Sequence, residues 1–87
     1  MSYQVRLRRA VQKQLDAITG EDYQAVAGAI SSLGREPRPP GIRKLADSGL
    51  WRIRVGSFRV VYTIDDKGHS VIVVRVVRRK EDTYRNL

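Results

Sequence analysis

The sequence predicts a small α+β domain in which an N-terminal strand and an antiparallel helical hairpin pack on one face of a four- to five-stranded, mainly antiparallel sheet. Apolar residues at helical spacing occupy the first part of the chain, and alternating apolar and polar residues occupy the second. A two-residue turn at Gly56-Ser57 joins two of the alternating segments. The length of 87 residues suits one domain, so we expect a single unit over residues 1–87.

The first elements are a strand and two helices. Residues 3–7 alternate between polar and apolar, which predicts a strand, and apolar spacing then predicts a helix over about 8–18. A second helix is expected to end near Gly34, with Thr19 as its N-cap residue. Its apolar stripe consists of Tyr23, Val26, Ala27, Ile30 and Leu33.

The remaining elements are strands. Residues 36–41 contain all three prolines and predict a stiff connector, which a short strand at 42–45 follows. Strands at 51–55 and 58–64 are expected to form a hairpin, because glycine at the first turn position suits a type II′ turn. Residues 71–77 are rich in valine, which predicts a central strand.

The hairpin turn also predicts a register that places arginines together. A two-residue turn sets Arg54 opposite Arg59 and Arg52 opposite Val61. Like charges directly opposite on a sheet are destabilising. We therefore expect these side chains to be held for an anion, and phosphate is the obvious candidate.

The last strand extends this arginine face if its alternation is unbroken. Val74 and Val76 are then expected to join Val60 and Tyr62 in the core, which places Arg75 on the open face. Trp51 and Tyr62 are expected to be core residues. The predicted open face carries five arginines, whose guanidinium forks suit phosphate oxygens. These are Arg52, Arg54, Arg59, Arg75 and Arg79.

The composition favours a polyanionic partner, either nucleic acid or an acidic protein. The net charge is +8 and the pI is about 10.6, and residues 42–87 carry most of the positive charge. There is no cysteine, and the one histidine lies on a predicted turn, so we expect neither a metal nor a cofactor. The longest apolar run, residues 71–74, is too short to cross a membrane, and no secretory signal is visible, so a cytoplasmic protein is expected.

Two segments resemble the RelE/ParE toxin superfamily, and the RelE-type branch most closely. They are Leu50-Trp-Arg-Ile-Arg-Val-Gly-Ser-Phe-Arg-Val-Val-Tyr62 and Arg75-Val-Val-Arg-Arg-Lys-Glu-Asp-Thr-Tyr-Arg85, and the resemblance extends over nearly the whole chain. It implies the toxin of a type II toxin–antitoxin pair that enters the ribosomal A site and cleaves mRNA there. The implied partners are a cognate antitoxin, a 70S-type ribosome and mRNA.

The resemblance also implies roles for individual residues. Arg52, Arg54, Arg59 and Tyr84 match catalytic positions of the family. Arg79 matches the arginine that follows the last strand, with Arg78 as the alternative. The expected RNA-binding residues are Lys44, Arg75, Arg78, Lys80 and Arg85.

The basic residues on the first hairpin strand raise a question about the proton acceptor. The best-known members of the family have lysines where this chain has Arg52 and Arg54, and arginine does not give up its proton in proteins. The acceptor is then either Tyr84 or an oxygen of the substrate phosphate.

Two alternatives stay open on the sequence alone. One is a ParE-like toxin that inhibits DNA gyrase without nuclease chemistry. The other is an inactive member that binds RNA or an antitoxin without catalysis.

Overall fold

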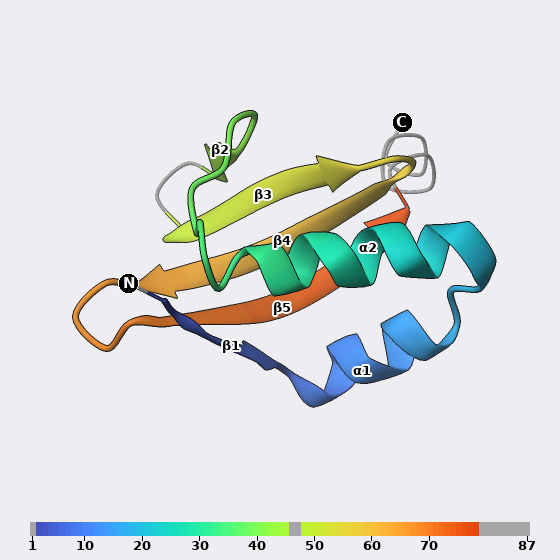
Figure 1. Ribbon diagram of the computed structural model, residues 1–87, viewed down its shortest axis with the longest axis horizontal. Coiled ribbons are helices and arrows are strands. Elements are labelled where there is room, and N and C mark those ends of the chain that lie inside the picture. Colours follow the sequence, from blue (N-terminus) through green and yellow to red (C-terminus); the bar gives the residue numbers. More distant parts are fainter. Residues whose placement is uncertain (1, 46–47, 79–87) are drawn as a thin grey trace.

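One sheet of five strands forms the body of the computed structural model, which describes residues 2–45 and 48–78 (Figure 1). Its strand order is β1-β5-β4-β3-β2, with β1 parallel to β5 and the other neighbours antiparallel. The predicted fold class is confirmed. In chain order the elements are β1 (Gln4–Leu7), α1 (Arg9–Asp16), α2 (Gly20–Ser32), β2 (Arg43–Leu45), β3 (Leu50–Val55), β4 (Phe58–Asp65) and β5 (Ser70–Arg78).

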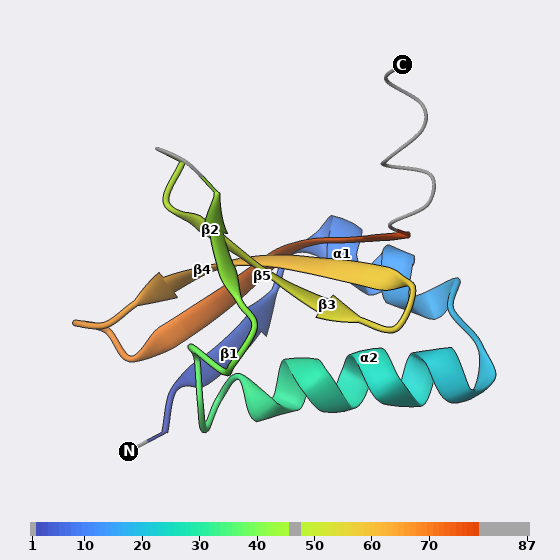
Figure 2. The same cartoon turned by 90° about the horizontal axis from the view of Figure 1, so that it is seen from above.

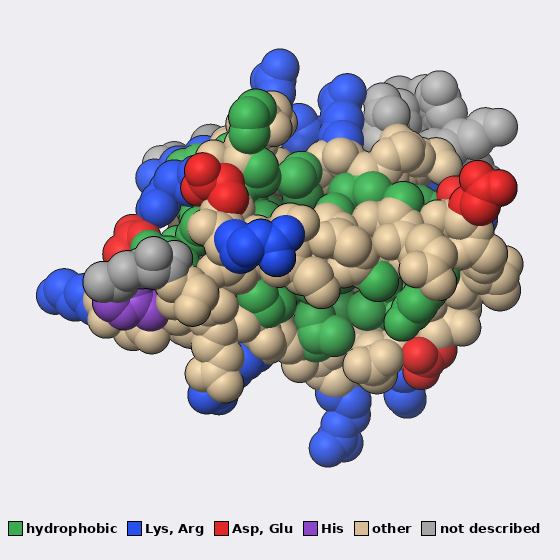
Figure 3. All heavy atoms as spheres, in the orientation of Figure 1, with side chains coloured by type: hydrophobic (Ala, Val, Ile, Leu, Met, Phe, Trp, Pro, Cys, Tyr) green, Lys and Arg blue, Asp and Glu red, His purple; other side chains and the backbone are tan. Residues whose placement is uncertain are grey.

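The helices bury one face of the sheet. Figure 2 shows α2 lying along this face. Val11 of α1 and Val26 of α2 are fully buried in one core with Tyr62 of β4. Trp51 is half-buried and packs against that core, as its position in the alternation predicts. In the space-filling view of the side that carries α2, most lysine and arginine side chains lie at the rim (Figure 3).

The start of α2 differs from the helix cap that was expected of Thr19. Thr19 occupies the N-cap position, but its side chain makes no capping hydrogen bond. Gly20 follows with φ +62°, in the left-handed region, whereas a capping box needs a regular first helical turn. Tyr23 of the predicted apolar stripe is 36% exposed, because it lies at the junction of the two helices rather than over the sheet.

The β3–β4 hairpin has the predicted turn and register. Gly56 has φ +58°, which is the conformation that the first position of a type II′ turn requires. Arg54 lies opposite Arg59, and Arg52 lies opposite Val61. The opposition of these two arginines across the hairpin is therefore a feature of the folded chain.

The last strand contains an irregularity that the sequence did not reveal. Val61 pairs with Arg75 and Tyr62 pairs with Val73, so Val74 is an extra residue on β5, as in a β-bulge. The prediction that Val74 belongs to the core is wrong, because the bulge moves it to the open face. Val73 is fully buried in its place, while Val76 is buried as expected.

A polar cluster fixes the proline-rich connector to the β4–β5 turn. Arg38 binds both carboxylate oxygens of Asp66, at 3.1 and 2.9 Å, and the Tyr3 hydroxyl donates to Asp66 at 2.7 Å. The hydrogen bond from Arg38 lowers the pKa of Asp66 to about 2. The Tyr62 hydroxyl donates to the Pro37 carbonyl at 2.9 Å, and burial raises the pKa of Tyr62 to about 12.

Candidate nucleic-acid interface

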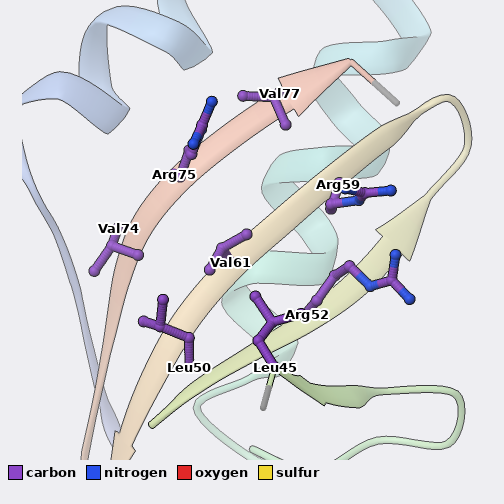
Figure 4. Close-up of a pocket in the computed structure, with 8 residues that line it drawn as sticks. All are labelled: Leu45, Leu50, Arg52, Arg59, Val61, Val74, Arg75 and Val77. Atoms are coloured by element: carbon purple, nitrogen blue, oxygen red, sulfur yellow. The ribbon is translucent and has the colours of Figure 1, made fainter. Parts of the chain in front are cut away.

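A pocket of about 240 Å³ opens on the face of the sheet away from α2 (Figure 4). The lining residues that the structure describes belong to strands β2 to β5, so the sheet itself forms the floor. They are Leu45, Leu50, Arg52, Arg59, Val61, Val74, Arg75 and Val77.

Three arginines give this pocket its charge. Arg52 and Arg59 are half-buried, and the Nε of Arg59 is buried. Their guanidinium groups extend toward the same side of the pocket, whereas Arg75 lies across Val61 on β5 (Figure 4). Among the lining residues that the structure describes there is no carboxylate, histidine or tyrosine. This described lining therefore suits an anion, and none of its side chains is a ready proton acceptor.

Two further arginines belong to the same face. Arg54 is exposed beside Arg59, to which it is paired, but it does not line the pocket. Arg43 on β2 lies directly opposite Arg52 and is also exposed. Arg43 was not among the residues predicted for this site. Alternation along β2 could have identified it, because side chains two residues apart on a strand share a face. Leu45 lies opposite Leu50 in the pocket, so Arg43, two residues earlier, lies on the same face.

Two predicted RNA-binding residues lie on the helix-facing side instead. Lys44 is paired with Trp51, and its Nζ lies 5.8 Å from the centroid of the indole ring. Arg78 is paired with Phe58, and its guanidinium carbon lies 4.8 Å from the centroid of that ring. The structure therefore separates both residues from the pocket. Arg78 is also the final residue of β5 rather than a residue beyond it.

The other predicted site residues fall outside the part of the chain that the structure describes. They are Arg79, Lys80, Tyr84 and Arg85. Within residues 2–45 and 48–78, no three Asp, Glu, His or Cys side chains cluster in a way that could hold a metal ion. The two helices described are each too short and too polar to cross a membrane.

A five-stranded sheet, covered by two helices on one face and carrying arginines on the other, defines a RelE-like α+β protein. The model of the family described as the ParE toxin of the type II toxin–antitoxin system parDE matches residues 5–83. The chain belongs to this family, within the RelE/ParE superfamily of type II toxins.

Individual relatives agree with this assignment. Toxin RelG of Mycobacterium tuberculosis is 35% identical over 89 residues, covering 98% of this chain and 99% of the relative. The RelE–RelB complex of Pyrococcus horikoshii superposes with a TM-score of 0.81 at 27% identity, covering 91% of this chain and 97% of that one. The toxin–antitoxin complex RelBE2 of M. tuberculosis superposes with a TM-score of 0.80 at 28% sequence identity, covering 91% of this chain and 100% of that one. The predicted RelE-type toxin is confirmed.

Proposed function

We propose that this toxin is a ribosome-dependent, metal-independent endoribonuclease of the cytoplasm that cuts mRNA in the A site. The observation that carries the proposal is the pocket in which Arg52, Arg59 and Arg75 surround an aliphatic floor, with no carboxylate among the lining residues of 2–45 and 48–78. Guanidinium groups bind phosphate oxygens through paired, charge-assisted hydrogen bonds. The strongly basic chain adds long-range attraction for the ribosome and its message.

The proposed reaction is an internal transesterification. The 2′-oxygen loses its proton and attacks the adjacent phosphorus, the bond to the 5′-oxygen breaks, and that oxygen receives a proton. The products are a 2′,3′-cyclic phosphate and a free 5′-hydroxyl. Arg52 and Arg59 would stabilise the negative charge that develops on the non-bridging oxygens.

The proton transfers need groups other than those lining the pocket. We propose that Tyr84 or an oxygen of the substrate phosphate takes the proton from the 2′-hydroxyl, and that Arg79 stabilises the leaving group. Arg54 would strengthen the field beside Arg59, and Lys80 and Arg85 would contact RNA. The ribosome would align the message for in-line attack, which lets a site without a strong base act.

We also propose a cognate antitoxin as a partner. The related toxin of P. horikoshii was solved together with RelB. An antitoxin with acidic and apolar segments would complement both the arginines and the aliphatic floor of the pocket. Such a partner would prevent access to RNA while it covers this face.

A translating extract with a defined mRNA tests the nuclease. Wild-type protein should produce new 5′ ends at codon-spaced positions in primer extension, and Arg59→Ala should slow their appearance by about 10²–10³. Arg9→Ala, at an exposed position on α1, is the matched control for loss of one positive charge and should cut at the wild-type rate. Full cutting by Arg59→Ala would contradict the assignment of the site.

The match to the ParE family favours a second candidate, inhibition of DNA gyrase without nuclease chemistry. A supercoiling assay on the same preparations separates the two. Intact mRNA together with inhibited supercoiling would establish the gyrase candidate and refute the endonuclease.

A further inference from the structure

A line of arginines crosses the open face from β2 to β5. Arg43 pairs with Arg52, Arg52 pairs with Val61, and Val61 pairs with Arg75, so these four residues form one row perpendicular to the strands. Neighbouring strands lie about 4.8 Å apart, so the row spans about 14 Å between its end strands. Val61 is its one uncharged member.

The row has room for more than one phosphate group. A guanidinium binds a phosphate oxygen at about 2.7–2.9 Å, which keeps each arginine close to the group it contacts. Arg43 and Arg75 stand at opposite ends of the row, with Arg52 and Val61 between them. Two phosphates, one on each side of Val61, would use the whole row.

The centre of the row is aliphatic. Val61 is flanked in the pocket by Leu50 and by Val74, which the irregularity in β5 brings to this face. Aliphatic side chains can pack against the flat surface of a nucleobase. The charged lining groups in the described part of the chain are all arginines, which donate hydrogen bonds and accept none. A ligand with anionic groups on either side of an apolar part fits this arrangement.

We infer that the row binds single-stranded RNA across the strands, with one unpaired base on the aliphatic floor between two phosphates. Arg75 binds the phosphate on one side, and Arg52 with Arg43 binds the phosphate on the other. A duplex does not fit this mode, because its bases are stacked and cannot lie flat on a protein surface. This inference rests on the proposed endonuclease and makes Arg43 a binding residue of that site.

The test uses a fluorescent 2′-O-methyl RNA hexamer, which lacks the 2′-proton needed for cleavage and so reports binding alone. Anisotropy titrations at several salt concentrations give the slope of log affinity against log salt. Arg43→Ala and Arg75→Ala should each make that slope shallower by about 0.7, the value expected for one phosphate contact on a single strand. Arg9→Ala should keep the wild-type slope. Wild-type slopes in both row variants would overturn the inference.

A second measurement tests whether a base binds on the aliphatic floor. Hexamers with one abasic position should bind wild-type protein several-fold more weakly when the missing base is the one on the floor. That loss should shrink in Leu50→Ala and in Val74→Ala, which remove parts of the floor. An equal loss in both variants, or competition by a hexaglutamate peptide as strong as by unlabelled RNA, would overturn the inference in favour of an unspecific or protein-binding surface.

The two proposals fail separately. Shallower slopes in the row variants without mRNA cuts in the extract would refute the endonuclease and leave an RNA-binding row. Codon-spaced cuts by wild-type protein together with unchanged slopes would refute the row and leave the endonuclease.

Discussion

Adjacent residues of β4 face two different environments. Val60 and Tyr62 are fully buried beneath the helices, whereas Arg59 lies in the pocket on the opposite face. The helix-facing side packs into the apolar core of the chain. On the open side, Arg43 lies opposite Arg52 and Arg54 lies opposite Arg59. Stability and ligand binding therefore depend on alternate residues of the same strand, and substitutions should separate them.

The largest contrast is expected between Val60→Glu and Arg59→Glu. Burying an unpaired carboxylate costs several kcal/mol, a large share of the roughly 5–15 kcal/mol that stabilises a domain. Val60→Glu should therefore unfold the protein, as circular dichroism would show. Arg59→Glu should keep the wild-type spectrum but lose affinity for the RNA hexamer. A folded Val60→Glu protein with an unchanged denaturation midpoint would contradict this division between the faces.

The next contrast lies on and just after α2. Leu33 is 1% exposed, and Leu33→Ala should lower the free energy of unfolding by about 3 kcal/mol through lost burial and a residual cavity. Tyr23 lies on the same predicted stripe but is 36% exposed, and Tyr23→Ala should change stability by no more than about 0.5 kcal/mol. Urea denaturation measures both, and equal losses would contradict the assignment of the core.

A smaller effect is expected where the core meets the connector. Tyr62→Phe removes the hydroxyl that donates to the Pro37 carbonyl and should cost about 1 kcal/mol of stability. Tyr23→Phe serves as the control for loss of a hydroxyl at an exposed position. If both variants unfold at the wild-type urea midpoint, this hydrogen bond contributes nothing measurable.

The smallest effect is expected from the exposed ion pair of the connector. The pKa of Asp66 is lowered from 3.8 to about 2, so the folded state favours the carboxylate. Its contribution to stability should be present above pH 4 and be lost as the pH falls from about 4 to about 2. Asp66→Asn should remove this part of the acid-induced loss of stability, measured by urea denaturation at a series of pH values. If the free energy of unfolding fell equally with pH in the wild-type and Asp66→Asn proteins, this contribution of Asp66 would be refuted.

The hairpin could be predicted because its turn and the alternation of its two strands together determine the register. Gly56-Ser57 sets the turn, and strict alternation on both strands then sets every pair, including Arg54 with Arg59. The helices were predictable from apolar spacing, apart from the capping contact at Thr19, which depends on the backbone of Gly20.

The last strand could not be predicted in the same way. Residues 71–77 are apolar at nearly every position, so alternation cannot indicate which valines face the core. The face of each depends on pairing with β4 and on the irregularity at Val74. Arg43 was missed for a related reason. A three-residue strand with two adjacent basic residues does not indicate which of them faces the pocket until the strand is paired with β3.

The parallel pairing of β1 with β5 also determines when the sheet can be completed during synthesis. Gln4 pairs with Ser70 and Leu7 pairs with Val73. Strand β1 therefore has no partner until β5 has been synthesised. Pairings between residues so distant in sequence slow folding, because a long stretch of chain must be closed into a loop before they form. Arg75 of the pocket lies on the same strand, β5. Neither the full sheet nor the arginine pocket can therefore form until β5 has been synthesised.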